Sequence, residues 1–166
     1  MISKQQFLDS VAHEVKVCKH IHSKLTPGQL DYKPGENTRT TLELLRYLTF
    51  CGAGPTRALV QDDWSPISRY QEAASSMSAE EFPEKMEAQL KEIHELLADV
   101  SEEDLQTREA PLPWGVREPL GASLVNLPLK FLASYRLQLF SYVKASGATQ
   151  LSTYDAWLGM DKPEEK

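Results

Sequence analysis

The sequence predicts an all-α fold, a four-helix bundle with long loops and a C-terminal tail packed on the bundle. Four long segments carry apolar residues at the three- and four-residue steps of a helix, and capping boxes precede three of them. No stretch alternates apolar and polar residues convincingly, as a half-buried strand would. Amphipathic helices without a sheet bury their apolar stripes against one another, so a bundle is expected.

The first helix is expected over about residues 3–25. Ser3 and Gln6 have the spacing of a capping box, which satisfies the first free backbone N–H groups. One stripe of the helix carries its apolar residues and one histidine: Leu8, Val11, Val15, Cys18 and His22. His13 and His20 point roughly the opposite way, because a helix turns by about 100° per residue.

The second helix is expected over residues 40–60, after a loop at residues 31–37 that is rich in Pro, Gly and Asn. Thr40 and Glu43 form its capping box. A kink or break is expected where Gly52, Gly54 and Pro55 interrupt the apolar pattern. Residues 62–77 are expected to be irregular.

The third helix is expected over residues 79–100, with a capping box at Ser78 and Glu81. Residues 101–104 predict one more short helical turn. Residues 107–117, which contain two prolines and a glycine, predict an extended loop or a short hairpin. The fourth helix is expected over residues 119–146, with a kink at Pro128 and a terminating Gly147. Its expected inner stripe is Leu124, Pro128, Phe131, Tyr135, Leu139 and Tyr142. Apolar residues at 151–161 predict that the tail packs back on the bundle.

Length and composition limit the class of protein. A chain of 166 residues with 41% hydrophobic and 25% charged residues is typical of one globular domain, here assigned to residues 1–166. The net charge of −6 and the lack of a basic stripe predict no nucleic-acid partner. No apolar run approaches the ~18 residues of a membrane span, and the N-terminus lacks a signal-peptide core. We therefore expect a cytoplasmic protein with no membrane partner.

Three segments resemble one known family. They are residues 25–34 after the first helix, residues 41–48 in the second, and the Arg-Leu-Gln-Leu run at 136–139 in the fourth. Together they resemble the DinB/YfiT-like four-helix bundles. The resemblance implies a cleft in which three histidines from the second and fourth helices hold a divalent metal. It further implies that a thiol-transferase activity is possible, since some members have one, and that the protein is a homodimer.

The residues at the family's metal positions differ from the family pattern. The resemblance maps the three histidines onto Tyr47, Phe131 and Tyr135. Zinc and nickel prefer imidazole, thiolate or carboxylate donors, so we expect no metal at these positions and no cofactor. An alternative metal site could be formed by Cys18, His22, Glu43 and Cys51. It is disfavoured because these residues are isolated in the sequence and do not have the spacing of a metal-binding motif.

We instead expect a partly apolar ligand pocket lined by His22, Tyr47, Phe131 and Tyr135. The alternative interpretation of His22 is a structural one, in which it is a hydrogen-bonded histidine of the core. Arg46 and Arg136 border these positions and are expected either to form salt bridges or to bind an anion.

Two classes of function follow. The first is a metal-free binding module for an unidentified small molecule, with an aromatic cleft between the first, second and fourth helices. The second is a DinB-like transferase that acts on a small thiol through a rebuilt active site. The first is favoured because no matched catalytic constellation can be assembled from the sequence. A bundle that mainly mediates homodimer formation is a third possibility.

Overall fold

The computed structural model describes residues 2–164, which are mostly helical. The α-helices are α1 (Lys4–His22), α2 (Thr41–Leu48), α3 (Ala53–Gln61), α4 (Ile67–Ser75), α5 (Phe82–Leu96), α6 (Glu102–Thr107), α7 (Leu120–Leu124) and α8 (Lys130–Ala145). Short 3-10 turns lie at η1 (Pro27–Gln29) and η2 (Ala79–Glu81), and π-helical turns at η3 (Val125–Leu129) and η4 (Tyr154–Leu158). Two short strands, β1 (Glu109–Pro111) and β2 (Arg117–Pro119), pair antiparallel.

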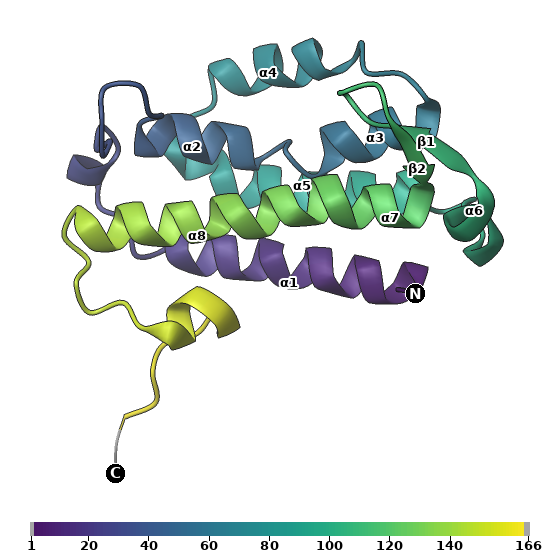
Figure 1. Ribbon diagram of the computed structural model, residues 1–166. Helices are drawn as coiled ribbons and strands as arrows, with labels where there is room; N and C mark the ends of the chain where they lie inside the picture. Colours follow the sequence, from purple (N-terminus) through teal and green to yellow (C-terminus); the bar gives the residue numbers. More distant parts are fainter. Residues whose placement is uncertain (1, 165–166) are drawn as a thin grey trace.

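Four helical layers run side by side, which confirms the predicted all-α bundle (Figure 1). The α1 helix packs between α5 and α8, while α2 lies against α8 and α3 against α5. The α1 and α7–α8 layers run in one direction, and the α2–α3 and α5 layers run in the other (Figure 1). The α4 helix crosses the outer side of α2 and α3 (Figure 1). Within the described residues, no helix combines the length and apolarity that crossing a membrane requires.

The three predicted capping boxes are all present. Ser3 N–H donates to Gln6 Oε1 at 2.9 Å, and Gln6 N–H donates back to Ser3 Oγ at 3.1 Å. The same reciprocal pair forms between Thr40 and Glu43 before α2 and at Ser78 before η2 and α5. Each box satisfies backbone donors that the first turn leaves free, so helix starts were predictable from local sequence.

The second layer breaks between α2 and α3, as its two glycines and proline predicted. Gln89 of α5, buried at 2% exposure, fills the break with its amide. Its Oε1 accepts from Gly52 N–H at 2.8 Å and Ala53 N–H at 3.1 Å, and its Nε2 donates to Leu48 O at 3.0 Å. The backbone groups freed by the break are therefore paired inside the core.

The prediction that residues 62–77 are irregular was wrong, because α4 lies there. Pro66 is its N-cap residue, a place where a missing N–H costs nothing. Ala74 is the buried residue of α4, and Ile67 and Tyr70 on the same stripe are half-buried, so this short helix offers few apolar residues as a signal. The other predictions between the long helices are confirmed: α6 follows Ser101, and β1 and β2 form the hairpin.

The fourth layer departs from the predicted inner stripe at two positions after Pro128. Pro128 lies inside the π-helical turn η3, which places one more residue in a turn than an α-helix does. Leu124, Pro128, Leu139 and Tyr142 are buried as predicted. After the turn, however, Leu132 and Arg136 face the core, whereas Phe131 and Tyr135 are only half-buried.

The tail packs back on the bundle, as predicted. Leu151 and Ala156 are buried, and η4 lies against α1 and α8. His13 Nε2 of α1 lies 2.7 Å from Trp157 O. The buried Arg136 forms an ion pair with Glu14 at 2.6 Å and donates to Ala156 O, so α1, α8 and the tail meet at one side chain.

Candidate functional site

The structure brings together the three positions that the family resemblance singled out. The Tyr47 ring of α2 lies 4.7 Å from the Tyr135 ring of α8, at an interplanar angle of 70°. The Phe131 ring lies 6.2 Å from the Tyr135 ring at 69°. Both pairs have the edge-to-face geometry that aromatic quadrupoles favour. Because α2 packs directly on α8, these side chains meet across the helix interface.

The fourth predicted pocket residue, His22, lies elsewhere. Its Nε2 is 2.8 Å from Ala79 O, and its ring is 5.0 Å from the Phe82 ring. It lines a separate hollow with Leu25 and Pro27. His22 is the last residue of α1, and this end of the helix faces η2 and the start of α5 rather than the tyrosines. The interpretation as a hydrogen-bonded, packed histidine therefore describes it, and burial lowers its pKa.

Arg39 completes the aromatic cluster and was missed at the sequence level. Its guanidinium carbon lies 4.2 Å from the centre of the Tyr47 ring and 5.6 Å from that of Tyr135. These are cation–π distances. Among residues 2–164, no hydrogen bond or close ion pair of the Arg39 side chain is found. Arg39 stands in a polar loop, where the sequence has no helical or strand period that could indicate its role. Its position directly before Thr40, the N-cap residue of α2, is the one feature of the sequence that could have suggested a role.

An open groove borders this cluster between α2 and α4. We call it the α2 groove, and it has a volume of about 310 Å³. It is lined by Arg39, Glu43, Arg46, Tyr47, Phe50, Gln71, Ala74 and Ser75. A neighbouring hollow shares Arg39 and Glu43 with the groove and extends to Tyr135. The hollows beside the aromatic cluster are thus a groove between α2 and α4 and a hollow that reaches α8.

The charges of the α2 groove are two guanidinium groups and one carboxylate. Glu43 Oε2 accepts from Thr40 N–H at 2.7 Å, and this capping bond lowers the pKa of Glu43. Arg46 donates from Nε to Met77 O at 2.9 Å. Burial, followed by the neighbouring Cys51 thiol and Tyr135 phenol, raises the pKa of Tyr47. Tyr47 therefore stays a neutral phenol at neutral pH.

The donor set does not fit the divalent metal of the family. Tyr47 is held neutral, Phe131 has no donor atom, and the Arg39 guanidinium lies over the two phenol rings. A second cation beside that guanidinium would be repelled, and a neutral phenol is a poor ligand for zinc or nickel. These three residues are therefore unsuited to binding a divalent metal ion.

The two cysteines are buried and unreactive in this arrangement. Burial raises the pKa of both the Cys18 and the Cys51 thiol, so neither is a ready thiolate nucleophile. Together with His22 and Glu43 they form no metal-type cluster. In the described part of the chain, such a cluster occurs at His20, Asp155 and Asp161 instead.

Comparison with known proteins identifies the fold. No known protein family matches the sequence, and no curated protein matches it either. Among solved structures, the crystal structure of a DinB-like protein from Bacillus subtilis, YjoA, matches with a TM-score of 0.71. The two sequences are 20% identical, and the match covers 90% of this chain and 97% of that one. The chain therefore has the DinB-like fold, in agreement with the resemblance of its three sequence segments.

Proposed function

We propose that this protein binds a small organic anion in the α2 groove, without a metal at Tyr47, Phe131 and Tyr135. The observation that carries the proposal is the Arg39 guanidinium, which rests on two phenol rings and makes no hydrogen bond or close ion pair among the described residues. Its planar N–H donors match the two oxygens of a carboxylate. The two rings therefore hold the Arg39 guanidinium in place, and its N–H groups remain able to donate hydrogen bonds to a ligand.

The rest of the groove suits a ligand with an apolar body. Tyr47, Phe50 and Ala74 supply apolar surface, while Arg46 adds a second positive charge and Glu43 offsets one. A singly charged carboxylate attached to a ring or an alkyl chain would match both features. A volume of about 310 Å³ lies at the small end of known ligand sites, which favours a compact ligand.

The alternative is a DinB-like transferase that acts on a small thiol through a rebuilt site. The buried, protonated cysteines and the neutral Tyr47 phenol give it less support, because neither supplies a nucleophile or a base. A homodimer, a cytoplasmic location and a single domain over residues 1–166 stay predictions that rest on sequence and resemblance. Sedimentation equilibrium would test the dimer.

The test is a calorimetric titration of chelator-treated protein with benzoate, phenylacetate, hexanoate and inorganic phosphate. We expect an aromatic or aliphatic carboxylate to bind, and Arg39→Gln to weaken it by about 10-fold to 100-fold. This range corresponds to the ~1.5–3 kcal/mol of a hydrogen bond to a charged group. Arg69→Gln is the matched control, since Arg69 is an exposed arginine of α4 outside the groove lining.

The proposal fails if no carboxylate binds the wild-type protein, or if Arg39→Gln and Arg69→Gln bind equally well. Circular dichroism confirms that each variant is folded. A parallel thiol-transfer assay with the same preparation separates the two functions. Turnover of a small thiol that survives Arg39→Gln would support the transferase alternative and contradict the binding role of the groove.

A further inference from the structure

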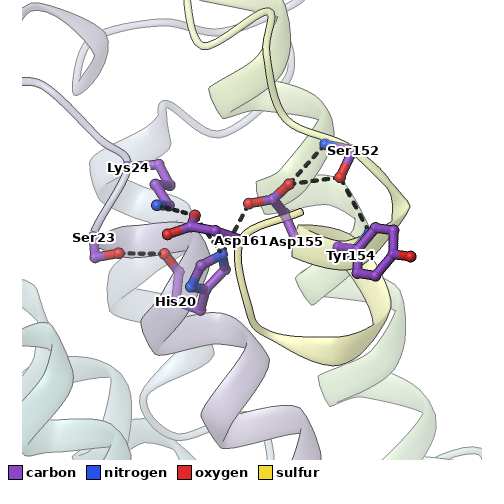
Figure 2. Close-up of polar contacts among 7 residues, drawn as sticks. All are labelled: His20, Ser23, Lys24, Ser152, Tyr154, Asp155 and Asp161. Atoms are coloured by element: carbon purple, nitrogen blue, oxygen red, sulfur yellow. Dashed lines mark hydrogen bonds and ion pairs between the residues drawn. The ribbon is translucent and has the colours of Figure 1, made fainter. Parts of the chain in front are cut away.

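A second cluster of ligand-type side chains lies at the C-terminal end of α1, where the tail packs against this helix (Figure 2). His20 comes from the last turn of α1, Asp155 from η4 and Asp161 from the segment after η4. His20 Nε2 lies 2.9 Å from Asp155 Oδ1 and 3.9 Å from Asp161 Oδ1. One ligand atom from each residue lies within 4.8 Å of the other two.

These separations suit a divalent ion of the zinc type. Zinc binds imidazole nitrogen and carboxylate oxygen at about 2.0–2.2 Å, which places tetrahedral ligand atoms roughly 3.3–3.6 Å apart. The two separations from His20, 2.9 and 3.9 Å, bracket that range, and the two aspartate oxygens lie within 4.8 Å of each other, so small movements of the three side chains would bring their donor atoms around one ion. One imidazole with two carboxylates is also a donor set that zinc accepts readily.

Asp155 is oriented for this role by a partner on its far oxygen. Its Oδ2 accepts from Ser152 N–H at 2.8 Å and from Ser152 Oγ at 3.0 Å, as Figure 2 shows. Its other oxygen, Oδ1, is thereby left facing His20. Outer partners of this kind fix the direction of ligating carboxylates in known metal sites. The Asp155 side chain is 6% exposed and that of His20 is 14% exposed, so this half of the cluster is largely shielded from solvent.

Asp161 supplies the open side. Its side chain is 74% exposed, and it forms an ion pair with Lys24. An ion that arrives from solvent can displace the Lys24 ammonium, which lies on a flexible stem and regains its hydration outside. A water molecule can occupy the fourth corner on the same side. The cluster therefore combines two fixed ligands with one that can close over the ion.

We propose that His20, Asp155 and Asp161 bind one divalent transition-metal ion, of which zinc is the best match. The ion fastens the tail to the end of α1, so its role is to hold residues 152–161 on the bundle. This site is distinct from the Tyr47, Phe131 and Tyr135 positions, and it is independent of the proposed anion groove.

The test is a calorimetric titration of chelator-treated full-length protein with zinc chloride, followed by cobalt chloride with visible absorption as a second readout. One zinc per chain is expected, and cobalt should give the intense absorption of a four-coordinate site. Asp161→Asn and His20→Gln should each weaken zinc binding by at least about tenfold, since removing even an outer partner costs 10-fold to 100-fold.

His13→Gln is the matched control. His13 also lies on α1 and also contacts the tail, through Trp157 O, but it is outside the cluster. It should leave zinc affinity unchanged. Asp161 is exposed, so Asp161→Asn keeps the test valid even if His20→Gln disturbs folding. The proposal is overturned if the wild-type protein takes up no zinc, or if Asp161→Asn binds it as tightly as the His13→Gln control.

Discussion

Arg136 offers a direct test of the register of α8. Its side chain is buried at 3% exposure, and its Nε lies 2.6 Å from Glu14 Oε2. Its guanidinium also donates to Ala156 O and lies 4.8 Å from the centre of the Trp157 ring. Replacing Arg136 by Met keeps much of the volume but leaves the Glu14 carboxylate, 13% exposed, without its cation.

The magnitude follows from these contacts. Breaking a buried ion pair by removing one partner costs about 3–5 kcal/mol, because an uncompensated charge stays buried. Trp157 is 57% exposed, so loss of its cation–π contact adds only about 0.5–1 kcal/mol. For a chain of this length the expected fall in melting temperature is roughly 7–24 °C. This is a large share of the ~5–15 kcal/mol that stabilises a typical domain.

The assay is urea unfolding followed by far-ultraviolet circular dichroism. The double variant Glu14→Gln, Arg136→Met should recover at least half of the lost stability, because it leaves no unpaired charge. Arg69→Met, at an exposed position of α4, is the control and should change stability by less than about 0.5 kcal/mol. A loss below about 1 kcal/mol for Arg136→Met would refute the register, because an arginine with so small an effect is at the surface.

Three further predictions concern packing, hydrogen bonding and pH. Gly121→Ala should destabilise by about 1–3 kcal/mol in thermal melts, because its Cβ would lie 2.9 Å from a backbone carbonyl of α6, whereas Gly28→Ala, with nothing within 4 Å, should be close to neutral; equal effects would contradict the close approach. Tyr135→Phe should cost about 1 kcal/mol in urea unfolding, the value of the lost hydrogen bond to Tyr47; an unchanged stability would contradict that hydrogen bond. Burial, then the hydrogen bond to a glutamate, raises the pKa of Tyr70 from 10.0 to about 12, so the unfolded chain releases this proton first and stability should fall as pH rises through that window. Tyr70→Phe should flatten this alkaline slope in melts at stepped pH, and an unchanged slope would contradict the assignment.

The fold was largely predictable because the signals that set it are local. Capping boxes fix the starts of α1, α2 and η2–α5, and the glycines near residue 52 mark the break between α2 and α3. The α4 helix was missed because it is short and buries little surface, so its apolar stripe consists of only Ile67, Tyr70 and Ala74. The half-burial of Phe131 and Tyr135 was missed for a different reason. Apolar periodicity assumes an unbroken α-helix, and a π-helical turn advances the pattern by one residue.

The site was predictable only in part. The meeting of Tyr47, Phe131 and Tyr135 could be predicted, because the family resemblance maps these three residues onto one site between α2 and α8. His22 was assigned to the same place because it shares the apolar stripe of α1. A stripe fixes the angle around a helix axis, but it does not say which neighbour lies opposite each turn. Arg39, and the pairing of His20 with Asp155 from 135 residues away, have no spacing signal at all.

Gln89 places an unusual demand on its position. It serves two backbone donors with one end of its amide and one backbone acceptor with the other, in a part of the core where no water is needed to complete the pairing. Glutamate has the same shape but would turn an acceptor toward Leu48 O, leucine would leave the two backbone N–H donors without this acceptor, and asparagine is one methylene too short. Natural variation should therefore tolerate many apolar exchanges around this residue while holding the amide itself nearly constant.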